Sequence, residues 1–141
     1  MFRSVLSVFL GFVLMMILTM TFFAVLFSIF PDSFPSLEEA EAGAPGTMSF
    51  GINCVVLVLD LLSAAFAGYF TAAVAGRKPL EHAGALALLV GTMGLVTLFT
   101  MFGDEPIWYQ LSRLFGAPVA VAAGGYFRTW QYAEKVPPSS P

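Results

Sequence analysis

Charged residues are scarce in this sequence. Only 11% of the 141 residues are charged, while 58% are hydrophobic and the mean hydropathy is +0.85. A soluble domain usually carries roughly 25% charged residues, and a soluble chain this short has too much surface to hide so much apolar side chain. The composition therefore predicts a protein that lies mostly within a lipid bilayer.

Side chains suited to metal binding and catalysis are equally few. The single cysteine, Cys54, excludes a disulfide within the chain, and with only one histidine, His82, there are too few ligands for a zinc site. The basic residues form no cluster of the kind that binds nucleic acid. Since no catalytic set and no glycine-rich phosphate loop is present either, we expect no enzyme activity, no metal, no bound cofactor and no nucleic-acid partner.

Long apolar runs divide the chain into four segments, and crossing a bilayer takes about 20 residues. We expect spans at about 4–30, 49–76, 82–102 and 107–127, followed by a disordered polar tail over 131–141. The first run is longer than the core of a cleaved signal peptide, which is about 7–15 residues, so we interpret it as an uncleaved helix. The predicted fold is all-α: an integral membrane four-helix bundle formed by residues 1–130.

The basic residues that flank these spans fall on one side only. They are Arg3, Arg77, Lys78, Arg128 and Lys135. The loops at 31–48 and 103–106, on the other side, carry acids and no Lys or Arg. Because basic flanks mark the cytoplasmic side of a membrane protein, we expect both termini to be cytoplasmic and the acidic loops to face the periplasm or the cell exterior.

Small residues recur at intervals of four in two of the predicted spans. They are Ala64, Gly68, Ala72 and Gly76 in the second span, and Gly116, Ala120 and Gly124 in the fourth. Lipid is as apolar as leucine, so helices in a membrane associate through close packing of small residues and through polar contacts. We therefore expect the second and fourth helices to pack against each other through these two ridges.

Two ionisable residues, Asp60 and Arg113, lie inside the predicted spans. A charge at such a depth costs about 2.5–3.5 kcal/mol on insertion scales and usually faces a partner. When the two helices are aligned at their basic ends, helical rise places the two residues within about 5 Å of each other in depth. We predict an ion pair that fixes helix register. The alternatives are a polar cavity for an ion, a proton or an anionic headgroup, and an Arg113 that reaches the outer interface while Asp60 is protonated or bound to another subunit.

His82 begins the third predicted span, beside Glu81. We interpret it as an interfacial residue that caps the helix or meets lipid headgroups. An axial ligand to a haem or chlorophyll is the alternative, although no second ligand lies at a matching depth.

The segment 68–86, GYFTAAVAGRKPLEHAGAL, resembles a helical hairpin of small uncharacterised bacterial four-helix membrane proteins, which carry a pattern like GGYxAAxxAGRxPLxHA. The matching residues are Gly68, Tyr69, Ala72, Ala75, Gly76, Arg77, Pro79, Leu80, His82 and Ala83. Ala67 and Thr71 depart from the pattern, but both keep a small residue there. The resemblance implies a multi-pass protein of the bacterial inner membrane, and it implies no activity.

These observations favour a non-catalytic membrane protein that packs against itself or serves as an accessory subunit of a larger membrane complex. One alternative is a small oligomeric transporter or channel-like protein that uses Asp60 and Arg113. Another is a helper protein that binds a lipid, a pigment or a haem, using His82 and the aromatic residues at the helix ends.

Overall fold

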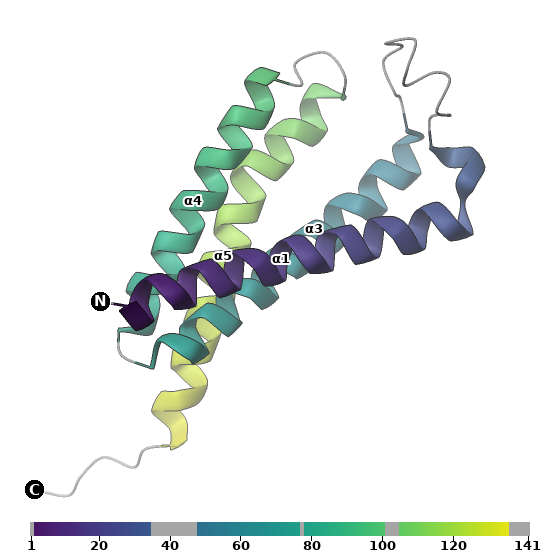
Figure 1. Ribbon diagram of the computed structural model, residues 1–141. Helices are drawn as coiled ribbons and strands as arrows, with labels where there is room; N and C mark the ends of the chain where they lie inside the picture. The colour runs from purple at the N-terminus through teal and green to yellow at the C-terminus, as the bar shows by residue number, and fades with distance from the viewer. Residues whose placement is uncertain (1, 35–47, 77, 101–104, 136–141) are drawn as a thin grey trace, which may run out of the picture.

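The computed structural model describes residues 2–34, 48–76, 78–100 and 105–135, and it is helical throughout this part of the chain, with no strand (Figure 1). The long helices are α1 (Phe2–Ile29), α3 (Phe50–Ala75), α4 (Pro79–Thr100) and α5 (Ile107–Lys135), and a short 3-10 helix, η1 (Pro31–Ser33), follows α1. The all-α class is therefore confirmed. Three segments, Val5–Ile29, Phe50–Ala75 and Pro79–Thr100, are long and apolar enough to cross a membrane.

Local chemistry explains where α3 and α4 begin and end. The Ser49 hydroxyl caps α3 by accepting a hydrogen bond from the backbone N–H of Ile52 at 3.4 Å. Gly76 ends the helix with φ = +67°, a conformation in which glycine has no steric cost. Proline suits the first turn of a helix because its missing N–H has no partner there anyway. For this reason α4 begins at Pro79, three residues before the predicted start at 82.

Helix α5 is longer than its predicted span. It runs to Lys135, so residues 131–135, which we expected to belong to a disordered tail, are helical. Two contacts hold this end of the helix. The Tyr69 hydroxyl donates a hydrogen bond to Gln131 Oε1 at 3.0 Å, and the Arg128 guanidinium lies over the Tyr132 ring at 5.7 Å. The first contact joins α5 to α3 and the second lies within α5, one turn apart, and composition alone reveals neither. Residues 136–141 lie outside the described part of the chain.

Helix α3 occupies the centre of the molecule, between α1 and α5. It runs parallel to α5, because Phe50 and Trp108 meet near the first turns of the two helices and Tyr69 meets Gln131 near their last turns. Helix α4 packs mainly on α5. Figure 1 shows that α1 and α4 begin close together and diverge toward their C-terminal ends. The divergence leaves part of α5 uncovered between them.

The buried side chains form two clusters along this arrangement. The first is Ala64, Ala67, Leu86, Val90 and Val121. The second is Leu26, Phe34, Val56 and Tyr109. On α3 the first cluster begins at Ala64 and the second ends at Val56, so Asp60 lies one helical turn from each. A carboxylate therefore sits between two apolar clusters, and it needs a partner there.

Candidate functional site

The backbones of α3 and α5 approach each other closely at two glycines. A Cβ added to Gly68 would collide with the Val121 carbonyl, and one added to Gly124 would collide with the Ala65 carbonyl. Neither position can hold a larger residue without moving a helix. Ala64 and Ala72 are also buried on this side of α3. The seam between α3 and α5 thus uses small residues in the manner typical of membrane helices.

The other small residues of the two ridges have different surroundings. A Cβ on Gly116 would lie 2.9 Å from Leu61 Cδ2, and Ala120 packs against the first apolar cluster. Gly76, which the spacing assigned to the packing ridge, instead caps α3, and a Cβ there would meet no atom within 4 Å. That assignment was wrong because the helix ends before the ridge reaches this residue.

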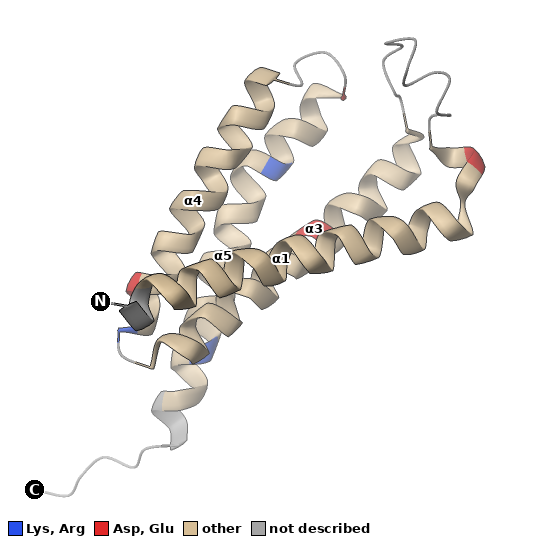
Figure 2. Cartoon of the chain, viewed as in Figure 1, with Lys and Arg blue, Asp and Glu red and all other residues tan. Residues whose placement is uncertain are grey.

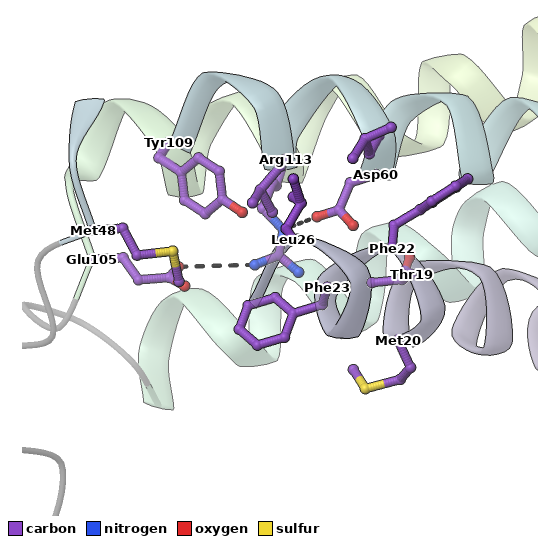
Figure 3. Close-up of a pocket in the computed structure, with 12 residues that line it drawn as sticks. Thr19, Met20, Phe22, Phe23, Leu26, Met48, Asp60, Glu105, Tyr109 and Arg113 are labelled. Carbon is purple, nitrogen blue, oxygen red and sulfur yellow. Dashed lines mark ion pairs between the residues drawn. The ribbon is translucent and has the colours of Figure 1, made fainter. Parts of the chain in front are cut away.

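An ion pair links the same two helices on the N-terminal side of the seam (Figure 3). Arg113 Nε of α5 lies 3.3 Å from Asp60 Oδ2 of α3. The Asp60 side chain is only 14% exposed, while that of Arg113 is 37% exposed. The structure therefore brings together the two ionisable residues that helical depth placed at similar levels.

Other elements complete the surroundings of this pair. Thr19 of α1 lies beside Asp60 as a side-chain hydrogen-bonding partner. Tyr109, one turn before Arg113, is buried, and its ring faces the guanidinium at 5.5 Å from the centroid to Cζ. A cation over an aromatic face is attracted by the ring quadrupole. The guanidinium is consequently held by an ion pair on one side and an aromatic ring on another.

Glu105 is a member of this site that the sequence analysis missed. Its Oε2 lies 3.8 Å from Arg113 Nη1. The sequence predicts a loop at 103–106, whose acids indicate only which side of the membrane it faces. Glu105 lies two residues before α5 begins at Ile107. It is eight positions before Arg113, about two helical turns, which is within reach of a long arginine side chain. The spacing of Tyr109 and Arg113, four residues on one helix face, was a second available signal.

Two cavities adjoin the charge cluster formed by Asp60, Glu105 and Arg113, and all three residues line both. One cavity, of about 170 Å³, lies among α1, α3 and α5 and is shown in Figure 3. The other, of about 300 Å³, lies among α1, α3, α4 and α5. The cluster thus separates two spaces that are otherwise mostly apolar.

His82 lies at the opposite end of the molecule, in the first turns of α4. Its Nδ1 donates a hydrogen bond to the Lys78 carbonyl at 2.9 Å, one turn back along the chain, and this bond satisfies none of the free N–H groups in the first turn of α4. Its neighbours Lys78 and Glu81 form an exposed ion pair at 2.8 Å, and the hydrogen bond and charge of Glu81 raise the pKa of Lys78. Within the described ranges, no three His, Cys, Asp or Glu side chains are grouped as metal ligands would be.

Apart from the Asp60–Arg113 pair inside the bundle and Glu81, which lies beside Lys78, the described basic and acidic side chains lie at opposite ends of the molecule (Figure 2). Lys78 follows the end of α3, and Arg128 lines a cavity together with Gly76 and Pro79 at the same end. Asp32 follows α1, and Glu105 precedes α5, at the other end. Arg77, Asp104, the acids at 38–41 and the side chains of Arg3 and Lys135 lie outside the described part of the chain.

Comparison of the chain with protein-family models, with curated proteins and with solved structures finds no match. The functional argument therefore rests on the helices and on the charge cluster.

Proposed function

We propose that the protein is a non-catalytic integral membrane protein that acts as a structural or accessory subunit, packing against a second copy of itself or within a larger membrane complex. The ion pair between Asp60 and Arg113 carries the proposal, because it joins α3 to α5 at the point where their glycine seam ends. A buried charge pair adds little net stability, but it can fix which register of two helices forms. The charges are thus used to define the shape of the bundle.

The outward faces of α1 and α4 are the surfaces we propose for contact with lipid or other subunits. Large apolar side chains project from both, including Phe9 and Met20 on α1 and Leu88 and Phe99 on α4. Such a face is stable only against lipid or another apolar surface.

We propose α5 as the fourth span, with the bundle in a bacterial inner membrane and both termini cytoplasmic. Helix α5 is less apolar than the other three because it carries Gln110, Arg113 and Arg128. Its parallel packing on α3 nonetheless supports a crossing. A helix that packs along the whole length of a membrane-spanning helix must extend across the same thickness of the bilayer. The distribution of Lys and Arg supports the orientation.

Purification from its native source in a mild detergent tests the subunit role. The mass of the protein complex, measured by light scattering and native mass spectrometry, is expected to correspond to a homo-oligomer or to a stoichiometric assembly with other membrane subunits. A particle that contains one copy of the chain and nothing else at every detergent concentration would contradict the proposal.

A small oligomeric transporter or channel-like protein is the second candidate, and the position of Arg113 between two cavities favours it. Four helices offer little room for a path, so this function would need several copies. Ion or solute flux into liposomes that contain the purified protein, lost on Arg113→Gln, would support it over the structural role.

A further inference from the structure

We infer that the larger of the two cavities beside the charge cluster, of about 300 Å³, binds an ethanolamine phospholipid, whose headgroup carries a primary ammonium. This cavity lies between α1 and α4 and is called the lateral cleft below. This inference goes beyond the proposed subunit role, because it names a ligand for a site that a structural role does not require.

The walls of the lateral cleft suit an acyl chain. Phe12, Met15 and Met16 of α1 face Val90, Met93 and Leu98 of α4 across a volume of about 300 Å³. Met16 and Met93, which line the cleft, are also exposed at the surface, so the cleft opens sideways. It lies between α1 and α4, whose backbones diverge (Figure 1). Methionine side chains adapt to irregular apolar partners. An acyl chain of a lipid in the surrounding bilayer can therefore enter the cleft from the side.

The charge of the cleft selects the sign of the headgroup. Two carboxylates, Asp60 and Glu105, share one guanidinium, that of Arg113. Asp60 lies closer to the guanidinium, at 3.3 Å, whereas Glu105 Oε2 is 3.8 Å from it, beyond hydrogen-bond length. This Glu105 oxygen is buried and receives no hydrogen bond from any residue that the structure describes. The cluster therefore has one unneutralised negative charge and an acceptor without a donor.

A primary ammonium meets both requirements, because it is positive and carries three N–H donors. A choline headgroup is positive but has no N–H group, and a purely anionic headgroup would be repelled by Glu105. The Arg113 side chain, which is 37% exposed, can contact the phosphate of the same lipid. Glu105 lies two residues before α5 begins at Ile107, so a headgroup at that end places the acyl chain along the cleft.

Competitive lipid retention tests the inference. The protein is reconstituted with equal amounts of ethanolamine, choline and glycerol phospholipids that have identical acyl chains, and the lipid retained after delipidation is measured by native mass spectrometry. We expect the ethanolamine lipid to be retained about tenfold more than the choline lipid, the effect of one charge-assisted hydrogen bond. Equal retention, or a preference for the anionic glycerol lipid, would overturn the inference.

Two pairs of variants locate the binding. Glu105→Gln is expected to remove the headgroup preference, whereas the matched change Glu81→Gln at the other end leaves it intact. Met93→Trp fills the lateral cleft and is expected to lower retention of every lipid. Leu88→Trp, a substitution on the exposed face of the same helix, is not expected to do so. A preference that survives Glu105→Gln contradicts the assigned role of Glu105.

The wild-type protein alone supplies a further test, which holds even if a variant fails to fold. Successive N-methylation of the ethanolamine lipid removes its N–H donors one at a time and keeps the charge. Because the site offers one acceptor without a donor, retention is expected to stay high while one N–H group remains and to fall about tenfold when the last is replaced by methyl. Retention that is constant across the series would contradict the inference.

Discussion

Arg113 makes three contacts that together fix its position: Asp60 from α3, Glu105 before the first turn of α5, and the ring of Tyr109 from its own helix. Replacing one member of a charge pair in an apolar setting costs more than the pair itself contributes, because the remaining charge is left without a partner. The site is therefore more sensitive to single substitutions than to the removal of both charges.

A double-mutant cycle with Asp60→Asn and Arg113→Gln measures this coupling. Breaking a fully buried pair costs about 3–5 kcal/mol. Because the Arg113 side chain is 37% exposed, we expect a smaller coupling of about 1–2 kcal/mol, read from unfolding in mixed micelles. The exposed pair Lys78–Glu81, with side chains 72% and 65% exposed, is the matched control. Its coupling should stay below about 0.5 kcal/mol. Additive effects at Asp60 and Arg113 would contradict direct pairing.

Glu105 changes how a charge-swap experiment must be designed. Exchanging Asp60 and Arg113 would place the new carboxylate at position 113 beside Glu105, and two like charges repel. We therefore expect the swap Asp60→Arg with Arg113→Asp to restore folded yield on a Glu105→Gln background and to restore less on the wild-type background. Size-exclusion chromatography of the expressed variants measures this yield. Equal recovery on the two backgrounds would show that Glu105 does not act on position 113.

The sequence predicted the meeting of Asp60 and Arg113 but not the rest of the cluster. Helical rise placed both residues at similar depth, and the small-residue ridges predicted that their two helices are neighbours. Glu105 lies just before a helix, where the reach of a side chain depends on how the chain enters the first turn. The position of Thr19 depends on how α1 crosses α3, and no periodicity in the sequence encodes a crossing angle.

At the scale of the helices, the α3–α5 seam depends on Gly68 and Gly124. The sequence predicted this contact because spacing by four places small residues on one helix face. It did not predict that Gly76 falls outside the contact, because a cap and a packing residue both call for glycine. The closest backbone approaches of the seam involve Ala65 and Gly68 of α3. The seam ends before Gly76, because this residue caps the helix.

Substitutions at Gly124 and Gly84 distinguish seam positions from open ones. Gly124→Val is expected to lower the free energy of unfolding by about 1–3 kcal/mol or to prevent assembly, because the new side chain meets the backbone of Ala65. A Cβ on Gly84 meets no atom within 4 Å, so Gly84→Val is the control and should cost much less. Comparable losses for the two variants would contradict the seam.

The end of α5 depends on a side-chain contact with α3. Tyr69→Phe removes the hydrogen bond to Gln131 and should weaken the last turns by about 0.5–1.5 kcal/mol. Hydrogen exchange of the amides at 129–132 is expected to accelerate, while exchange in the middle of α5 is unchanged. Tyr126→Phe, at an exposed tyrosine of the same helix, serves as the control. No local change in Tyr69→Phe would mean that this end folds without α3.

At the scale of the whole molecule, composition and packing differ on whether α5 crosses the membrane. Composition marks three helices as apolar enough to cross a membrane, and α5 is not among them. Packing nevertheless joins α5 to α3 from the contact of Phe50 and Trp108 to that of Tyr69 and Gln131. Two of the polar residues that reduce the hydropathy of α5 make contacts with α3: Arg113 with Asp60, and Arg128 with the ring of Tyr69. The sequence could suggest the number of helices. Where a less apolar helix such as α5 lies relative to the others depends on its packing, which composition does not give.

The side of the membrane on which the C-terminus lies tests the four-span bundle most directly. A fluorescent protein that folds only in the cytoplasm and a phosphatase that is active only outside it can each be fused after residue 141, with matching fusions at the N-terminus. If α5 crosses the membrane beside α3, both termini are cytoplasmic, so the C-terminal fluorescent fusion is bright and the C-terminal phosphatase fusion is inactive. A dark fluorescent fusion and an active phosphatase at the C-terminus, with the N-terminus cytoplasmic, would mean that α5 does not cross, and the ion pair of Asp60 and Arg113 would then not lie within a four-span bundle.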